Sequence, residues 1–259
     1  MCQCLLRDLT NVEARVRAAA KISLFLDYDG TLVPFVQDPA EAKLDQQTRE
    51  TVARISSNDR FTVSMISGRS VSDLRDHIGV QSVVYAGNHG LEICGNGLQF
   101  IEPTAATRRE ELAQLSRKLA ADLQFVEGAV VEYKGLTTTV HYRLAAARDI
   151  SKIENVVRAA VASAAESFRT ASSKMAVEVV PRTGWDKGRA AAWINQRQGG
   201  KPLSFYFGDD ESDEDAFRVL PDGITVRVGS CTATYARYCV ADTLAVHNFL
   251  TWLGDHVPA

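Results

Sequence analysis

Residues 24–34, LFLDYDGTLVP, are the most informative stretch of the chain, because an apolar run ends there in two closely spaced carboxylates, Asp27 and Asp29. Such a run predicts a buried strand, and the polar residues behind it then lie at the carboxyl end of that strand. Carboxylates at this edge lose hydration energy unless another group compensates their charge. A divalent cation together with a phosphate group would provide that compensation.

The bulk composition is that of an ordinary globular protein. The 259 residues are 46% hydrophobic and 24% charged, with a formal net charge of −3, which argues against nucleic-acid or membrane-surface partners. No apolar segment approaches the roughly 18 residues that a membrane span requires, and the N-terminus lacks a signal-peptide core. The five cysteines are mostly scattered, so we expect free thiols in a reducing cytoplasm.

The first and last regions alternate strand and helix signals. This alternation is typical of βαβ units around a parallel sheet, so the sequence predicts an α/β fold. The predicted strands are residues 22–26, 61–66, 83–86, 203–207 and 224–229. The predicted helices are residues 45–57, 70–78, 185–198, 211–220 and 243–253.

The middle region has a different character. After a hairpin over 91–101, it reads as a helix, two antiparallel strands, a second helix and a further strand, an αββαβ order typical of a small α+β layer. The helices and strands are expected at residues 106–123, 130–144 (two strands), 149–168 and 174–181. We therefore expect a core domain of residues 1–102 and 182–259 and an inserted cap domain of residues 103–181, with hinges near its ends.

Three polar motifs follow strands of the predicted parallel sheet. They are DYDGT at 27–31, SGR at 67–69 and GDDESDED at 208–215. Each alone is commonly a turn or a solvated helix start. Ligands bind at the carboxyl ends of strands in open parallel sheets, so all three are expected to meet there. Three such motifs on one edge are difficult to explain as unrelated turns.

This combination resembles the haloacid-dehalogenase-like (HAD) phosphatases over nearly the whole chain. The resemblance implies a Rossmann-like parallel-sheet core with the inserted α+β cap. It also implies that Asp27 is the nucleophile that forms an aspartyl-phosphate. Asp29 would be the general acid for the leaving alcohol and then the base for the hydrolytic water.

The resemblance also implies a Mg²⁺ site. Asp27, the backbone carbonyl of Asp29, and Asp209 match the metal ligands of that family. Asp210 and Asp213 would lie around them, with Asp213 orienting the waters on the metal. Oxygen ligands of this kind suit Mg²⁺.

The transferring phosphoryl group needs further partners. Lys187 in GWDKG matches the lysine that neutralises its charge, although an isolated lysine there would read as a surface residue. Ser67 matches the phosphate-binding hydroxyl, with Gly68 in the same loop. Arg69 either contacts the phosphate or braces the loop, and the sequence leaves both readings open.

Within the superfamily, the chain looks like the trehalose-6-phosphate phosphatases. The resemblance rests on GNHGLE at 87–92, HYR at 141–143, GWDKG at 184–188, and an ExK pair followed by a later glutamate. It implies that Glu132, Lys134 and Glu178 bind the sugar hydroxyls distal to the phosphate. Glu132 and Lys134 are two residues apart on a strand and so share a face. An ordinary cross-strand salt bridge is the alternative.

Four further residues are candidates for substrate contact. Asn88 and His89 belong to the GNHGLE segment, where His89 either contacts substrate or caps a turn. His141 and Arg143 lie on the strand face opposite Tyr142, so at least one of them is expected to face the ligand.

The leading hypothesis is a Mg²⁺-dependent hydrolase of trehalose 6-phosphate. Its rivals are the same fold acting on sucrose 6-phosphate or on a glucosyl- or mannosylglycerate phosphate, a phosphosugar mutase, and a non-catalytic sugar-phosphate sensor. The expected partner is a small sugar phosphate, with no nucleic acid and no membrane. We expect the protein to be a monomer or a weak dimer.

Overall fold

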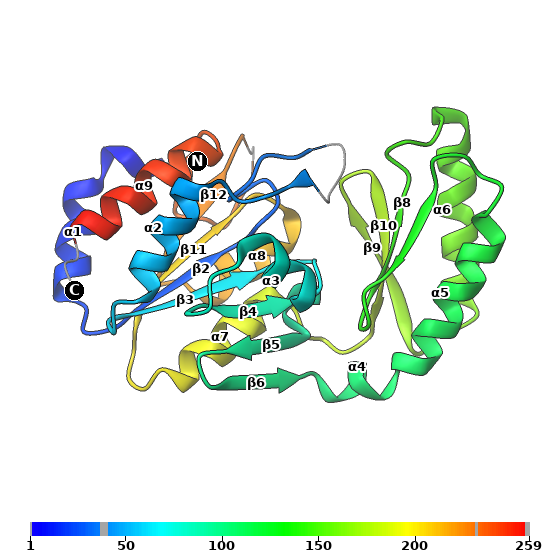
Figure 1. The fold of residues 1–259 in the computed structure, drawn as a ribbon, viewed down its shortest axis with the longest axis horizontal. Helices are drawn as coiled ribbons and strands as arrows, with labels where there is room; N and C mark the ends of the chain where they lie inside the picture. The colour runs from blue at the N-terminus through cyan, green and yellow to red at the C-terminus, as the bar shows by residue number, and fades with distance from the viewer. Residues whose placement is uncertain (1, 37–40, 231–232, 257–259) are drawn as a thin grey trace. The chain divides into compact units, whose positions relative to one another are not determined.

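The computed structural model describes residues 2–36, 41–230 and 233–256. They form two compact units, drawn as a ribbon in Figure 1. One unit joins Met1–Phe100 to Trp185–Ala259, and the other is the inserted segment Ile101–Gly184. The predicted cap, residues 103–181, has nearly the same limits as this inserted segment.

The larger unit is built on one sheet. Among the described residues the sheet has nine strands in the order β1-β13-β12-β11-β2-β3-β4-β5-β6. In this sheet order, each neighbouring pair between β1 at the edge and β4 is parallel, and β5 is antiparallel to β4. The strands are β1 Gln3–Cys4, β2 Ile22–Leu26, β3 Phe61–Ile66, β4 Val84–Gly87, β5 Glu92–Gly95, β6 Leu98–Ile101, β11 Leu203–Gly208, β12 Ile224–Val228 and β13 Tyr238–Val240. The predicted α/β class is therefore confirmed.

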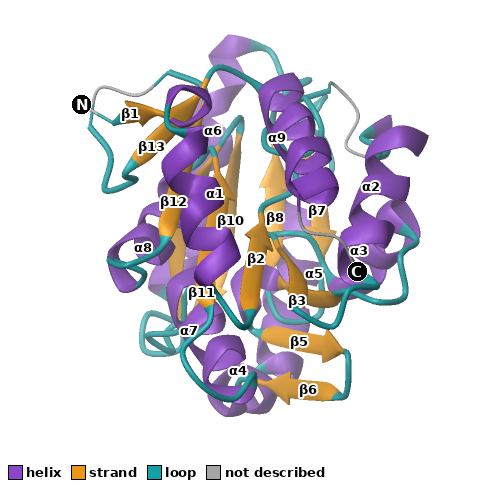
Figure 2. Cartoon of the chain, turned by 90° about the vertical axis from the view of Figure 1, so that its left-hand side faces the viewer, coloured by secondary structure: helices purple, strands orange, loops and turns teal. Residues whose placement is uncertain are grey.

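Helices cover both faces of this sheet, as Figure 2 shows. One face packs against α1 Leu9–Ala18, α2 Gln46–Ser56, α3 Val71–Ile78 and α9 Thr243–His256. The other packs against α7 Lys187–Arg197 and α8 Glu211–Val219. Short 3₁₀ helices occupy Leu5–Arg7 and Asn88–Gly90.

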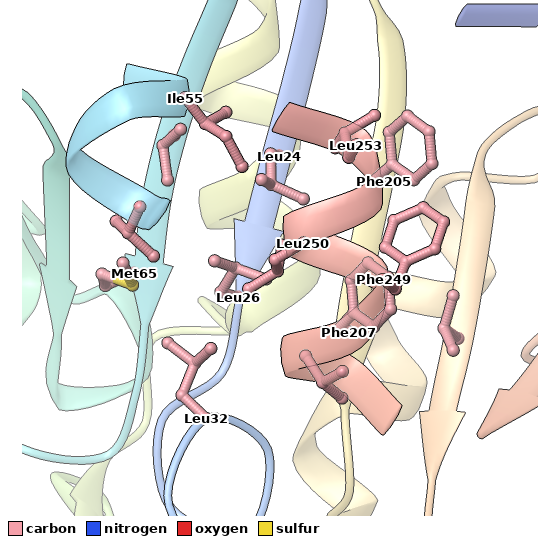
Figure 3. Close-up of a cluster of buried hydrophobic side chains, with 14 of the residues drawn as sticks. Leu24, Leu26, Leu32, Ile55, Met65, Phe205, Phe207, Phe249, Leu250 and Leu253 are labelled. Atoms are coloured by element: carbon pink, nitrogen blue, oxygen red, sulfur yellow. The ribbon is translucent and has the colours of Figure 1, made fainter. Parts of the chain in front are cut away.

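The central strands are buried on both faces, which explains why they read as continuous apolar runs. Leu24 and Leu26 of β2 point to the α9 side, whereas Phe25 points to the α7 side. Figure 3 shows α9 placing its apolar side chains over β2 and β11. Each fully buried side chain of this size contributes about 1.5–3 kcal/mol, so the strands that carry the polar motifs are firmly anchored in the core.

The smaller unit is an antiparallel sheet with helices on one face. The sheet order is β7-β8-β10-β9, and the long helices α5 and α6 share a core with it. The elements are α4 Pro103–Thr107, α5 Arg109–Leu123, β7 Val130–Tyr133, β8 Thr138–His141, α6 Ala147–Ala162, β9 Phe168–Ser173 and β10 Ala176–Pro181.

The predicted αββαβ order omits one strand that the structure contains, β9. The predicted helix 149–168 ends at Ala162, and residues 168–173 form β9 at the sheet edge. The segment Ser163–Ser167 is rich in helix formers, so local propensity favours a longer helix. Backbone pairing of β9 with the whole of β10, together with complete burial of Phe168, overrides that propensity.

The chain ends hold elements that the sequence pattern did not reveal. β1 and β13 are two and three residues long, too short for a recognisable alternation. Cys2, Cys4, Cys94 and Cys239 are free thiols, as expected, while Cys231 lies outside the described residues. Within the described ranges, every helix is too short or too polar to span a bilayer.

Candidate active site

The topology brings the three polar motifs to one edge of the sheet. β2 lies between β11 and β3 and runs parallel to both, so residues 27–31, 67–69 and 208–215 all follow the carboxyl ends of neighbouring strands. The amide of Asp27 donates to the carbonyl of Phe207 at 3.0 Å, which extends the β2–β11 pairing into the first motif.

Three buried carboxylates gather at this edge. Oxygens of Asp27, Asp209 and Asp213 all lie within 4.8 Å of one another. Carboxylates this close repel one another unless cations or hydrogen-bond donors offset their charge. The first and last motifs thus meet, as the sequence predicted, although they lie far apart in the chain.

Lys187 supplies one such cation. Its Nζ donates to Oδ1 of Asp27 and to Oδ1 of Asp213, each at 2.8 Å, and only 3% of the side chain is exposed. Lys187 is the first residue of α7, where Asp186 caps the helix by accepting from the amide of Arg189 at 2.7 Å. The cap fixes the direction in which the helix begins and so helps to aim Lys187 inward.

Burial and the charge of the neighbouring ion-pair partner shift the pKa values of Asp27 and Lys187 in opposite directions. Burial raises the pKa of Asp27 well above its usual value, with Lys187 opposing and Asp213 and Asp209 adding to the rise. Burial would lower the pKa of Lys187, but the charges of Asp213 and Asp27 outweigh it and hold that pKa above its usual value. Lys187 is therefore a permanent cation between the two carboxylates.

Asp213 receives three hydrogen bonds. Its Oδ1 accepts from Lys187 and, at 2.9 Å, from the hydroxyl of Tyr206, and its Oδ2 accepts from the amide of Asp210 at 3.0 Å. A Cβ added to Gly208 would lie 2.2 Å from Cγ of Asp213, so only glycine leaves room for this carboxylate. Asp213 is thus held by protein donors, which suits it to an orienting role.

The remaining oxygens suit a hard cation. Gly30 has φ +85°, and a Cβ there would lie 2.4 Å from Oδ2 of Asp209, so the loop after β2 packs its backbone directly against that carboxylate. The carboxylate oxygens of Asp27, Asp209 and Asp213, within 4.8 Å of one another, are the kind of oxygen donor that Mg²⁺ prefers. The residues present therefore fit a magnesium ion.

Asp29 is paired with Arg69. The guanidinium donates to both carboxylate oxygens of Asp29: Nε donates to Oδ2 at 2.6 Å, and Nη2 donates to Oδ1 at 2.8 Å. The third nitrogen, Nη1, donates to Asp73 at 2.7 Å. Such a bidentate pair fixes the orientation of the Asp29 carboxylate and also offsets its charge. Arg69 thereby joins the loop after β2 to the first turn of α3.

The loop that contains Ser67 and Gly68 is joined by backbone hydrogen bonds to the loop that contains Asn88 and His89. The amide of His89 donates to the Ser67 carbonyl at 2.8 Å, and the amide of Asn88 donates to the Arg69 carbonyl at 2.7 Å. Asn88 and His89 have φ values of 50° and 58°, a conformation that asparagine and histidine tolerate better than most residues. This backbone conformation turns the amides of both residues toward the loop of residues 67–69.

In the smaller unit, the predicted sugar-binding residues share one sheet face. Glu132 and Glu178 both register with Thr139 of the central strand β8. Lys134 Nζ contacts Glu178 at 2.6 Å, and Nε2 of His141 contacts Glu132 at 2.8 Å.

The helices lie on the other side of that sheet. Val140 and Val179, which neighbour Thr139 and Glu178 in the sequence, pack in the core with α5 and α6, so the acidic face is the one away from the helices. Arg143 follows β8 and is half-buried.

Two contact residues were missing from our site prediction. Thr31 donates from Oγ1 to Oδ2 of Asp27 at 3.2 Å, and its place in the DYDGT motif is a signal that could have identified it. Tyr206 reads in the sequence as one more apolar strand residue, and only its contact with Asp213 shows otherwise.

Comparison with known proteins identifies the family of this chain. The family described as trehalose-phosphatase matches residues 25–243. A trehalose 6-phosphate phosphatase of Zea mays is 30% identical over 92% of this chain and 72% of its own length. A trehalose-phosphate phosphatase of Mycobacterium avium is 34% identical over 78% of this chain. The matched region is 52% of the Mycobacterium avium protein, so the chain spans about half of that relative.

Solved structures share the fold. The C-terminal domain of a Candida albicans trehalose-6-phosphate phosphatase superposes with a TM-score of 0.82 at 22% identity, covering 99% of both chains. A haloacid dehalogenase-like hydrolase of Bacteroides thetaiotaomicron superposes with a TM-score of 0.65, covering 90% of this chain and 99% of its own. From its family match and its relatives, the chain belongs to the trehalose-phosphatase family, a family of phosphatases.

Proposed function

We propose that this protein hydrolyses trehalose 6-phosphate to trehalose and phosphate, a step in trehalose biosynthesis. The observation that carries the proposal is the buried cluster of Asp27, Asp209, Asp213 and Lys187 at the sheet edge. This cluster combines a nucleophile, a cation and metal-binding oxygens in one place. Family membership supports the choice of substrate.

In the proposed reaction, an oxygen of Asp27 attacks phosphorus and the bond from phosphorus to the sugar oxygen breaks. Asp29 gives a proton to the departing sugar oxygen. A water then gives a proton to Asp29 and attacks the aspartyl-phosphate, which releases phosphate and restores Asp27. Lys187 offsets the negative charge around Asp27 during both steps. Ser67, Gly68 and Arg69 are proposed to contact the phosphate.

We assign the cation site to Asp27, Asp209 and the backbone carbonyl of Asp29, with Mg²⁺ as the metal. When bound, the ion would offset charge on the phosphoryl oxygens. Asp210 and Asp213 lie around it, and the donors that Asp213 already accepts from support its orienting role.

The inserted unit is proposed to be the cap that selects the sugar. Glu132, Lys134 and Glu178 would bind the distal hydroxyls, with Asn88, His89, His141 and Arg143 as further contacts. Charged groups that both donate and accept suit vicinal hydroxyls. The cap assignment is supported by the shared face of the glutamates. A cytoplasmic monomer or weak dimer remains our expectation.

Phosphate release tests the substrate directly. We expect release from trehalose 6-phosphate well above that from sucrose 6-phosphate, glucosylglycerate phosphate and glucose 6-phosphate, because a cap built for a disaccharide contributes binding energy in the transition state. EDTA should abolish release and excess Mg²⁺ should restore it. Equal rates on glucose 6-phosphate and trehalose 6-phosphate would remove the disaccharide claim, and transfer without free phosphate would identify a mutase.

Metal binding is also expected to stabilise the fold. At about 100 times its dissociation constant a ligand adds about 2.7 kcal/mol, which for a chain of this size raises Tm by several degrees. Thermal melts with Mg²⁺ or EDTA should show this rise in the wild type and in Asp222→Asn, whose carboxylate is exposed. Asp209→Asn should lose most of it. An undiminished rise in Asp209→Asn would place the metal elsewhere.

Removing Glu132 should separate sugar recognition from chemistry. We expect Glu132→Ala to lower kcat/KM for trehalose 6-phosphate about 10- to 100-fold and to spare a small aryl phosphate, because the hydrogen bonds proposed between Glu132 and the substrate reach the sugar and not the phosphate. Glu111→Ala is a matched control, because Glu111 is exposed in the first turn of α5. Equal losses on both substrates would contradict a role in sugar binding.

A further inference from the structure

Tyr206 is a buried polar side chain that the proposed reaction does not yet use. It lies on β11 two residues before Gly208, and the residue has 0% exposure. Its ring packs beside Phe25 and meets Phe217 edge-on, with centroids 6.1 and 5.6 Å away. These contacts leave the ring little freedom, so its hydroxyl has a fixed position.

That hydroxyl points at Asp213. It donates to Oδ1 at 2.9 Å, the same oxygen that accepts from Lys187 at 2.8 Å. Burial, followed by the charges of Asp213 and Asp27, raises the pKa of Tyr206 well above its usual value, so the phenol remains a donor at all working pH values.

The chain of contacts therefore runs from a rigid strand to the nucleophile. Tyr206 holds Asp213, Asp213 holds Lys187, and Lys187 reaches Oδ1 of Asp27 at 2.8 Å. The other oxygen of Asp213 is fixed by the amide of Asp210. Since every member is buried, loss of one donor would leave part of a carboxylate unsatisfied and would favour its rotation.

We propose that Tyr206 is a positioning residue for phosphoryl transfer, which sets Asp213 so that Lys187 stands at Asp27. The inference deepens the proposed function and rests on it. A lysine displaced by a few tenths of an ångström offsets developing charge less well, because electrostatic stabilisation depends on preorganised geometry. Tyr206 acts through two other side chains and touches neither the phosphate nor the metal in this scheme.

The first test is Tyr206→Phe, which removes one oxygen and keeps the ring. We expect kcat to fall about tenfold on trehalose 6-phosphate and on a small aryl phosphate alike, with KM unchanged. Tyr85→Phe is the matched control, because it removes a buried hydroxyl bonded to the Val80 carbonyl at 2.6 Å, on β4 and outside the acidic cluster. A wild-type kcat in Tyr206→Phe, or an equal loss in Tyr85→Phe, would overturn the proposal.

The second test separates positioning from simple packing. If Tyr206 works through Asp213, then adding Tyr206→Phe to Asp213→Asn should cost little beyond the single Asp213→Asn loss, because residues that act as a unit are not additive. If the fold-loss of kcat in the double variant equals the product of the two single losses, the two residues act independently and the positioning role of Tyr206 is refuted.

A third readout does not depend on catalysis. Crystal structures of Tyr206→Phe and Tyr85→Phe should show Lys187 Nζ displaced from Asp27 or Asp213 only in the first. If the distances from Lys187 Nζ to Asp27 and Asp213 in Tyr206→Phe are the same as in the wild type, the positioning role is wrong. If the wild type releases phosphate from no sugar phosphate, the proposed function fails by itself, and the aryl phosphate and the crystal structures still decide the role of Tyr206.

Discussion

Asp27→Asn is expected to lower kcat by roughly 10³–10⁶-fold, the range seen when an enzyme loses its nucleophile. The amide keeps the size of the carboxylate, and its single oxygen can still accept from Lys187, which contacts Oδ1 of Asp27 at 2.8 Å. Its NH2 group replaces Oδ2, the oxygen that accepts from Thr31 at 3.2 Å, and it can donate to that hydroxyl instead. What it loses is the anionic oxygen that attacks phosphorus. Phosphate release and acid-quench trapping of a phosphoenzyme from labelled substrate measure the two steps.

The control for this variant is Asp45→Asn. Asp45 caps α2 by accepting from the amide of Thr48 at 2.9 Å, and asparagine caps a helix about equally well. We therefore expect near-normal activity from the control. Trapped phosphate on Asp27→Asn, or turnover close to that of the wild type, would mean that another side chain is the nucleophile.

Lys187→Met is expected to affect both activity and stability. It leaves Asp27 and Asp213 buried beside each other without their shared cation. Breaking a buried ion pair by removing one partner typically costs about 3–5 kcal/mol. Activity should fall at least as far as in Tyr206→Phe, because the cation itself is lost.

The stability loss should depend on pH. The folded-state pKa of Asp27 is raised above the usual 3.8, mainly by burial and against the charge of Lys187. A raised folded pKa contributes stability below the unfolded pKa, and that contribution is lost as pH rises through the folded pKa. Without Lys187 the pKa of Asp27 rises further, so the penalty of the variant relative to the wild type develops as pH rises through the folded-state pKa of Asp27 in the wild type.

Thermal melts of the wild type and Lys187→Met at pH 5 and pH 8, all in EDTA, check this. The difference in Tm between the two proteins should be larger at pH 8. Arg189→Met is a suitable control, because this exposed arginine lies in the first turn of the same helix. A difference in Tm that is independent of pH would show that the cation does not govern the buried carboxylates.

The sequence predicted the central elements well for a physical reason. β2, β3 and β11 are buried on both faces, so their apolar runs are unmistakable and the motifs behind them are easily placed. Parallel pairing then implies a shared edge. The meeting of Asp27 with Asp209 follows from that edge, whereas Lys187 was assigned from the family resemblance.

The sequence failed where local signals conflict with long-range pairing. β9 follows a stretch rich in helix formers, and it is a strand because β10 pairs with it along its length. The edge strands β1 and β13 are too short to have a pattern of their own. Arg69 could be placed in its loop, but its two carboxylate partners, Asp29 and Asp73, could not be chosen from spacing.

Local patterns in the sequence were sufficient to predict the fold class, the three motifs and the identity of the acidic and basic groups, because buried strands and the turns behind them are local features. The pairing of each carboxylate with its donors, in contrast, depends on the folded structure. Asp213 accepts from Tyr206, Lys187 and Asp210, residues whose contacts depend on how β11 packs against α7 and α8. Hydrogen bonds act over about 3 Å, so they are fixed by packing that no spacing rule specifies.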